Sequence, residues 1–152
     1  MSLISLILVI FISECSECDC KPVAANANER PHGANEFILI PDIKVKRIAG
    51  KVFRQLSDYP ENEAIVEVFN YSSSSLDYKD VQNALVKKRR AACMTGENGV
   101  FCFNKLPPGR YLLRAGTRKF AAMNEIHAIV IVLPKNQKGS TEEIELTLKP
   151  GT

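Results

Sequence analysis

Residues 95–111, with the sequence T-G-E-N-G-V-F-C-F-N-K-L-P-P-G-R-Y, constrain the fold of this chain more than any other stretch. Asn98 and Gly99 accept backbone conformations with positive φ at little cost, so the chain is expected to reverse there. Phe101 and Phe103 then recur at every second position, which is the period of a strand that buries one face. A rigid Pro-Pro-Gly run follows, and the alternation resumes after it. This succession of strands and tight turns is typical of a β-sandwich.

The same stretch carries G-x-F-x-F followed by L-P-P-G-x-Y-x-L, which resembles the signature of carboxypeptidase regulatory-like domains. Residues 48–52 (I-A-G-K-V) and 64–68 (A-I-V-E-V) resemble the first two strands of that family, and residues 144–148 (I-E-L-T-L) resemble its last strand. The resemblance covers residues 46–149, apart from an insertion at residues 71–90. It implies an all-β fold, a seven-stranded Greek-key β-sandwich of the transthyretin-like (prealbumin-like) type. This fold has many uses, so the family implies little about activity.

Alternating apolar residues predict the seven strands at residues 45–54, 63–70, 91–95, 100–104, 110–116, 126–133 and 143–149. Residues 21–45 are interpreted as a linker or an extra strand, since small and polar residues, Pro and Gly dominate the first part. Residues 128–133 are apolar at every position, whereas a sandwich strand should place polar residues on its outer face. The insertion, the N-terminal segment or another chain is expected to cover that face. Strong β-propensity with partial exposure is the alternative.

The insertion at residues 71–90 is interpreted as a short helix or a loop. Residues 76–86 have a helix-compatible spacing of apolar residues. The following cations, K-K-R-R at residues 87–90, could contact phosphate, but no aromatic residue is interleaved with them. We interpret them as solvated cations at a helix end. The net charge of +3 is also too small to indicate nucleic acid, so no nucleic-acid partner is expected.

The first twenty residues differ in composition from the rest. Residues 3–12, L-I-S-L-I-L-V-I-F-I, are too few to span a bilayer and have the length of a signal-peptide core, although no Lys or Arg precedes them. We interpret residues 1–20 as a signal peptide with a Cys-rich processing region, and we expect a secreted protein or one of the periplasm or cell envelope. The mature chain is expected to begin between residues 16 and 21. A lipid anchor at Cys15 is an alternative.

The chain has five cysteines, which would tend to pair in an oxidising compartment. If Thr95 pairs with Val100 across the turn, Cys93 falls opposite Cys102, at a Cα separation of about 4.5 Å that a disulfide can bridge. A two-residue turn at Asn98 and Gly99 would instead place Thr95 opposite Cys102. We therefore predict a structural disulfide between Cys93 and Cys102. Two free thiols are the alternative.

The remaining cysteines, Cys15, Cys18 and Cys20, have the spacing C-x-x-C-x-C, which could hold a metal ion. A structural metal site usually needs a second Cys/His cluster, and His32 lies twelve residues further on. We expect a processed or loosely disulfide-bonded N-terminus, with no metal site and no cofactor.

Catalytic interpretations lack suitable residues. His32 lies in the expected linker, and His127 begins an apolar strand, where a structural imidazole is the simpler interpretation. The sequence contains no G-x-S-x-G, no H-E-x-x-H and no Gly-rich phosphate loop. Transthyretin-like hydrolases end in Y-R-G-S, whereas this chain ends in L-K-P-G-T. We therefore expect no enzymatic activity, with such a hydrolase as the alternative from another class.

The sequence indicates a secreted, non-catalytic β-sandwich module for binding or structural support outside the cytoplasm, with a protein or glycan partner. Carbohydrate binding is the alternative, because starch-binding-like modules share this architecture. The chain has no Trp, so the aromatic platform for a sugar would be Tyr59, Tyr71 and Tyr78. Exposed tyrosines in a groove with Asn or Asp would favour a sugar, and an uncovered apolar patch would favour a protein partner.

Overall fold

The computed structural model describes residues 18–24, 26–31, 37–55, 59–75, 77–118, 123–140 and 143–151. The expected signal-peptide core, the lipid-anchor position Cys15 and His32 lie outside the described residues. Within the described residues, no helix is both long enough and apolar enough to cross a membrane.

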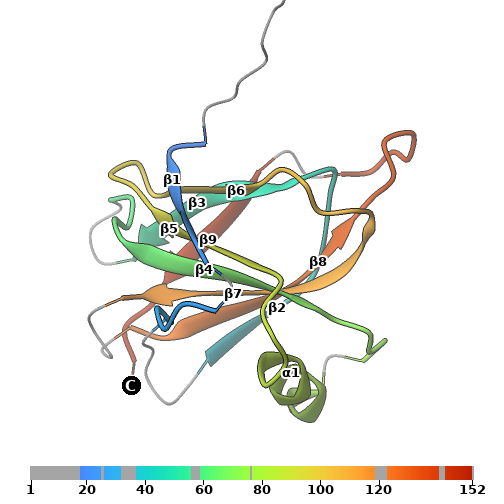
Figure 1. The fold of residues 1–152 in the computed structure, drawn as a ribbon, viewed down its shortest axis with the longest axis horizontal. Coiled ribbons are helices and arrows are strands. Elements are labelled where there is room, and N and C mark those ends of the chain that lie inside the picture. Colours follow the sequence, from blue (N-terminus) through green and yellow to red (C-terminus); the bar gives the residue numbers. More distant parts are fainter. Residues whose placement is uncertain are drawn as a thin grey trace, which may run out of the picture.

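The described chain folds into an all-β sandwich with one short helix (Figure 1). The elements are β1 (Cys20–Val23), β2 (Phe37–Val45), β3 (Ile48–Arg54), β4 (Ala64–Asn70), α1 (Tyr78–Leu85), β5 (Ala91–Thr95), β6 (Val100–Phe103), β7 (Gly109–Thr117), β8 (Glu125–Val132) and β9 (Ile144–Leu148). One sheet has the strand order β1-β5-β4-β7-β8-β2, and the other has the order β6-β3-β9. Pairing is antiparallel except for β2 with β8 and β3 with β9.

All seven expected strands are present, but the count of seven is too low for the described residues. The two further strands, β1 and β2, come from the segment interpreted as a linker or an extra strand, and they form the opposite edges of the larger sheet. Pro41 and Asp42 lie where the pairing of β2 with β8 shifts between Ile40 and Ile43. An edge strand tolerates such a proline because its backbone nitrogen need not join the ladder.

The core lies between the two sheets and contains the residues that the alternation places inward. Phe101 on β6 is fully buried, and Phe103 is nearly so. They share one cluster with residues of the facing strands, which include Val52, Val66, Val68, Tyr111, Leu113, Ile144, Leu146 and Leu148. Leu106 is partly buried and packs against that cluster. The expected inward face is thereby confirmed.

The outer face of β8 is covered, as the apolar run had suggested. Ile129 packs in a second hydrophobic cluster with Phe69 and Leu112 of the neighbouring strands and with Val81 and Ala84 of α1. The helix begins after Asp77, whose side chain accepts a hydrogen bond from the backbone nitrogen of Lys79. The insertion is therefore helical, and it shields one part of the larger sheet (Figure 1).

The turn at residues 96–99 leads from one sheet to the other. The backbone nitrogen of Gly99 donates to the carbonyl oxygen of Gly96, and Gly99 has a φ of 67°. A Cβ atom at Gly99 would lie 2.5 Å from the carbonyl oxygen of Val52, so the turn also requires glycine for its close approach to β3. Because β5 and β6 belong to different sheets, this turn makes a corner of the sandwich and not a hairpin.

Candidate functional site

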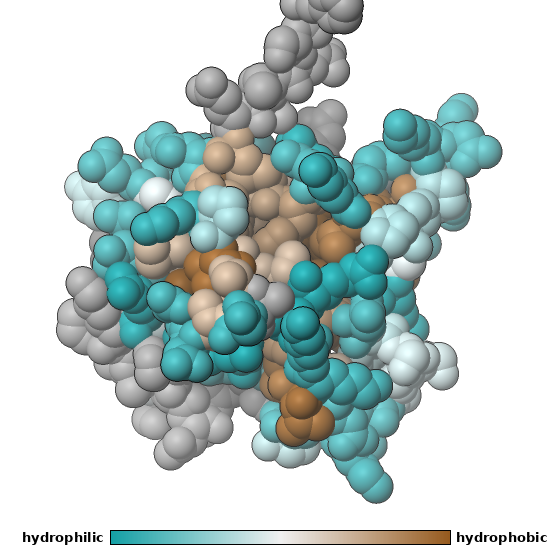
Figure 2. Space-filling model, in the orientation of Figure 1, coloured by the Kyte–Doolittle hydropathy of each residue, from teal (hydrophilic) through white to brown (hydrophobic). Residues whose placement is uncertain are grey.

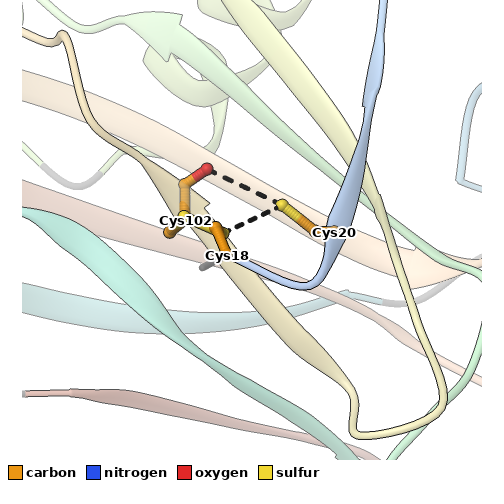
Figure 3. Close-up of side chains that lie close together, drawn as sticks. All are labelled: Cys18, Cys20 and Cys102. Carbon is orange, nitrogen blue, oxygen red and sulfur yellow. Dashed lines mark hydrogen bonds between the residues drawn. A yellow bond between two sulfur atoms is a disulfide. The ribbon is translucent and has the colours of Figure 1, made fainter. Parts of the chain in front are cut away.

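Four cysteines gather where the free edges of the two sheets face each other. Cys20 begins β1, Cys93 lies on β5, Cys102 lies on β6, and Cys18 lies two residues before the start of β1. Within the described residues, β1 pairs only with β5 and β6 pairs only with β3, so both are edge strands. Figure 3 shows the sulfur of Cys20 directed toward the disulfide that joins its two neighbours.

The disulfide joins Cys18 to Cys102, with 5.9 Å between their Cα atoms. The expected Cys93–Cys102 pairing is wrong for this structure, in which Cys93 is a free, buried thiol. The error lies in the assumed hairpin, because β5 and β6 are not hydrogen-bonded neighbours. The actual bridge ties the segment before β1 to the edge of the smaller sheet.

Cys20 keeps a free thiol beside this bridge. Its Sγ lies 3.1 Å from Sγ of Cys18 and 3.9 Å from the carbonyl oxygen of Cys102. A hydrogen bond with the Cys93 thiol lowers the pKa of Cys20 to about 6, against the opposing effects of burial and of the Asp19 charge. Cys93 has the reverse environment, since its hydrogen bond with Cys20 and its burial raise its pKa. The hydrogen bond between the two thiols thus favours the thiolate at Cys20 and the protonated thiol at Cys93.

The sulfur atoms of Cys18, Cys20 and Cys102 all lie within 4.8 Å of one another. Thiolates at such separations can share a soft metal ion, because each thiolate contributes one ligand atom. In this structure two of the three sulfurs are joined to each other, so they cannot serve as thiolate ligands. The cluster in this form is a disulfide beside a free thiol. Only after reduction of the disulfide could the three sulfur atoms hold a metal ion.

The cysteines border an apolar hollow, here called the edge cleft. Its first part, about 330 Å³, lies between β1, β5 and β6 and is lined by Cys20, Pro22, Val23, Arg90, Ala91, Ala92, Cys93, Cys102 and Phe103. Its second part, about 410 Å³, is lined by Arg90, Ala91, Phe103, Asn104, Lys105 and Leu106. The parts share three residues and are therefore continuous. Figure 2 shows an apolar surface exposed in the middle of this face, between hydrophilic side chains.

The three tyrosines proposed as a sugar platform do not share one exposed surface. Tyr71 is buried, and its hydroxyl donates to the carbonyl oxygen of Ser75. Tyr59 and Tyr78 are exposed at 73% and 60% of their surface, in the segment before β4 and at the start of α1. Tyr71 does line a small polar pocket of about 170 Å³ beside α1, together with Asn70, Ser72, Ser73, Asp80, Asn83, Ala84 and Lys87.

A buried charge cluster on the outer face of the larger sheet was not expected. Glu67 on β4 is fully buried and accepts hydrogen bonds from Arg30, Arg89 and Arg114. Arg89 was interpreted as one of four solvated cations, which is wrong, because its side chain is fully buried. A sequence signal did exist. Glu67 is the one charged residue of β4, Arg114 interrupts an apolar run of β7, and the two residues lie directly opposite each other.

His127 belongs to the neighbouring strand and is also buried. It lies directly opposite Arg114, and its Nε2 is 3.1 Å from Oε2 of Glu125. The polar partner explains how an imidazole is accommodated on an apolar strand.

No protein-family model matches the chain, and no curated protein matches it either. Among solved structures, the chain is similar to the crystal structure of catechol 1,2-dioxygenase from Pseudomonas arvilla C-1, at 10% sequence identity and a TM-score of 0.37. The similarity covers 86% of this chain and 62% of that one, so the chain spans less than two thirds of the length of that structure. A similarity at this TM-score assigns neither a fold family nor an activity.

Proposed function

We propose that the protein is a secreted, non-catalytic β-sandwich module that binds a protein partner outside the cytoplasm. The observation that carries the proposal is the edge cleft, an apolar surface that the described residues leave uncovered between two edge strands. Exposed apolar surfaces rimmed by polar residues are typical of interaction sites. The Cys18–Cys102 disulfide supports a location outside the cytoplasm, since structural disulfides persist mainly in oxidising compartments.

The occupant that we propose is an extended apolar segment with acidic residues. The described lining contains no Asp or Glu, whereas Arg90 and Lys105 are both cationic. Apolar side chains of the partner would pack over Phe103 and Leu106, while its carboxylates would pair with the two cations. The neighbouring edge strands also offer backbone groups to an extended chain.

We further propose that the domain belongs with the carboxypeptidase regulatory-like β-sandwiches. The motif residues that carry the resemblance, Phe101, Phe103 and Tyr111, are all buried in the shared core, which supports the proposal. The hydroxyl of Tyr111 donates to the carbonyl oxygen of Pro107 at 2.6 Å and so ties the Pro-Pro-Gly turn to the strand that follows it.

The binding proposal is tested with fluorescent ten-residue peptides and anisotropy titrations on the purified domain. One peptide alternates Val with Asp, a second replaces each Asp with Lys, and a third replaces each Val with Ser. We expect only the Val/Asp peptide to bind, and Arg90→Glu to weaken its binding several-fold. Lys88→Glu is the matched control, since Lys88 is exposed but does not line the cleft. Equal binding of all three peptides, or equal effects of the two variants, would contradict the proposal.

Carbohydrate binding remains the second candidate. The polar pocket beside α1 has Asn, Asp and Ser side chains that could bind sugar hydroxyls, but its Tyr71 ring is buried and cannot stack on a sugar face. A glycan array with the same purified domain decides between the candidates. Selective glycan binding that is lost in Asn83→Ala, without binding of the Val/Asp peptide, would favour the carbohydrate function.

A further inference from the structure

We propose that Cys20 is the nucleophile of a thiol–disulfide exchange site whose resident disulfide is Cys18–Cys102. In the exchange, the electron pair of the Cys20 thiolate forms a bond to Sγ of Cys18. The Cys18–Cys102 bond breaks, and its electron pair leaves with Cys102 as a thiolate. The product contains a Cys18–Cys20 disulfide and a free Cys102. No net oxidation or reduction occurs, and the proton that Cys20 gives up to solvent is matched by the one that Cys102 takes up.

The distance between the reacting atoms supports the exchange. Sγ of Cys20 lies 3.1 Å from Sγ of Cys18, which is within the separation of about 3–3.5 Å at which reacting atoms are poised for attack. The three sulfur atoms lie within 4.8 Å of one another, so the leaving sulfur stays beside the new bond and the reverse reaction is equally accessible. The exchange is therefore an equilibrium between two bonded forms.

The backbone can accommodate the product. Two residues of an extended chain advance by about 6.6 Å, which falls within the range of about 4.4–6.8 Å between the Cα atoms of bridged cysteines. Cys18 and Cys20 are two positions apart in the sequence; Cys20 is the first residue of β1, and Cys18 and Asp19 precede the strand. A Cys18–Cys20 bond thus requires no rearrangement of the sheets.

The ionisation states of the thiols favour Cys20 over Cys93 as the attacking group. Only the thiolate is a nucleophile, and a thiol whose pKa lies near or below the ambient pH attacks efficiently. The hydrogen bond from Cys93 lowers the pKa of Cys20 to about 6, whereas the pKa of Cys93 is raised. Cys93 acts as a positioning residue that stabilises the Cys20 thiolate.

The exchange changes how the two sheets are tied together. In the form seen here, the bridge joins the segment before β1 to β6 across the edge cleft. In the exchanged form that tie is released, and Cys102 presents a thiol to the cleft alongside Cys93. The reaction needs no ligand in the cleft, so this inference stands apart from the proposed peptide binding.

The test is disulfide mapping of the purified, secreted full chain. The protein is held at pH 8, quenched in acid and treated with N-ethylmaleimide, and then cleaved before Asp19 and after Glu97 so that the four cysteines fall on separate peptides. We expect two forms, Cys18–Cys102 with a free Cys20 and Cys18–Cys20 with a free Cys102. Cys20→Ser should leave only the Cys18–Cys102 form, and Cys93→Ser should retain both.

A second measurement keeps the test valid if Cys20→Ser does not fold. Low concentrations of iodoacetamide are added to the wild-type chain, and the labelling of Cys102 is followed over time. If the exchange occurs, Cys102 should be labelled in the folded protein. The rate of its labelling should be at least tenfold higher than the rate of global unfolding. A single Cys18–Cys102 form together with an unlabelled Cys102 would overturn the proposal. Exchange that survives Cys20→Ser but is lost in Cys93→Ser would overturn the assignment of Cys20.

Discussion

Glu67 and Arg89 form an ion pair in which both side chains are completely buried, with 3.0 Å between Oε1 and Nη1. The same guanidinium donates to the carbonyl oxygens of Ala24, Ala27 and Glu29. These carbonyls follow β1, and the described residues 24 and 26–31 form no strand or helix. The pair therefore fixes that segment against the outer face of the larger sheet, where α1 does not reach.

We predict that Arg89→Ala lowers the free energy of unfolding by about 3–5 kcal/mol, because it removes a partner from a buried carboxylate and a donor from three carbonyls. Urea denaturation measures the loss. Arg90→Ala is the control, since Arg90 is exposed and should change stability by no more than about 0.5 kcal/mol. Limited proteolysis should also cut near residues 26–31 faster in Arg89→Ala. Equal stability of the two variants would show that Arg114 and Arg30 alone satisfy Glu67.

The alternation of apolar residues was sufficient to predict the strands and the core of this protein, because each strand buries one face and the period of two is visible in the sequence. It was not sufficient for β1, whose four residues, C-K-P-V, are too few to show a period of two and are held by the bridge at Cys18 and by pairing with β5. The burial of Arg89 was also hidden, because a run of four cations looks alike whether or not one of them meets a buried carboxylate.

The prediction of a Cys93–Cys102 disulfide was wrong because it, too, depended on a contact that the local sequence does not show. A turn that contains Asn98 and Gly99 predicts a reversal of the chain, but it does not say whether the next strand returns to the same sheet. Here β6 joins the other sheet, and Cys102 therefore meets Cys18, which lies 84 positions away in the sequence. The edge cleft follows from the same corner, so it too could not be predicted.

The core assignment predicts the effect of truncating an aromatic residue. Phe103→Ala should lower the free energy of unfolding by about 3–5 kcal/mol, because it removes buried apolar area and leaves a cavity between the sheets. Tyr59→Ala, at a ring that is 73% exposed, is the control and should have little effect. Thermal and urea unfolding measure both variants. A loss of less than 1 kcal/mol in Phe103→Ala would mean that the side chain does not contribute to the core.

Reduction of the Cys18–Cys102 bridge should lower the free energy of unfolding more than reduction of a hairpin disulfide would. The Cys18–Cys102 bond spans 84 positions, and closing a loop of that length stabilises the folded state by roughly 4.5 kcal/mol in the chain-entropy description. Urea unfolding of the wild type with and without a phosphine reductant should show a loss up to that size. Cys102→Ser should lose little more when the reductant is added. A reduction effect in Cys102→Ser as large as in the wild type would place the stabilising bridge elsewhere.

The pKa of Cys20 predicts a pH profile for its alkylation. Below about pH 6 the thiol is protonated and reacts slowly; above that pH the thiolate predominates, and the rate should approach a plateau by neutral pH. Cys93, whose pKa is raised, should remain unlabelled in the folded protein. In Cys93→Ala, which removes the hydrogen-bond donor, the midpoint should shift upward. Mass spectrometry after timed treatment with iodoacetamide measures each site, and a wild-type midpoint near 8.5 would contradict the proposed environment.

The bridge also narrows the expected position of signal cleavage. The apolar run ends at residue 12, and a mature chain that contains the Cys18–Cys102 disulfide must still contain Cys18. We therefore predict that the mature protein begins between Ser16 and Cys18, within the wider range that the sequence alone allowed. N-terminal sequencing and the intact mass of protein from the native host measure the start. A chain that begins at Asp19 or later would exclude the disulfide, an intact Met1 in a cytoplasmic fraction would contradict export, and a lipid-sized mass increase on Cys15 would establish the anchored alternative.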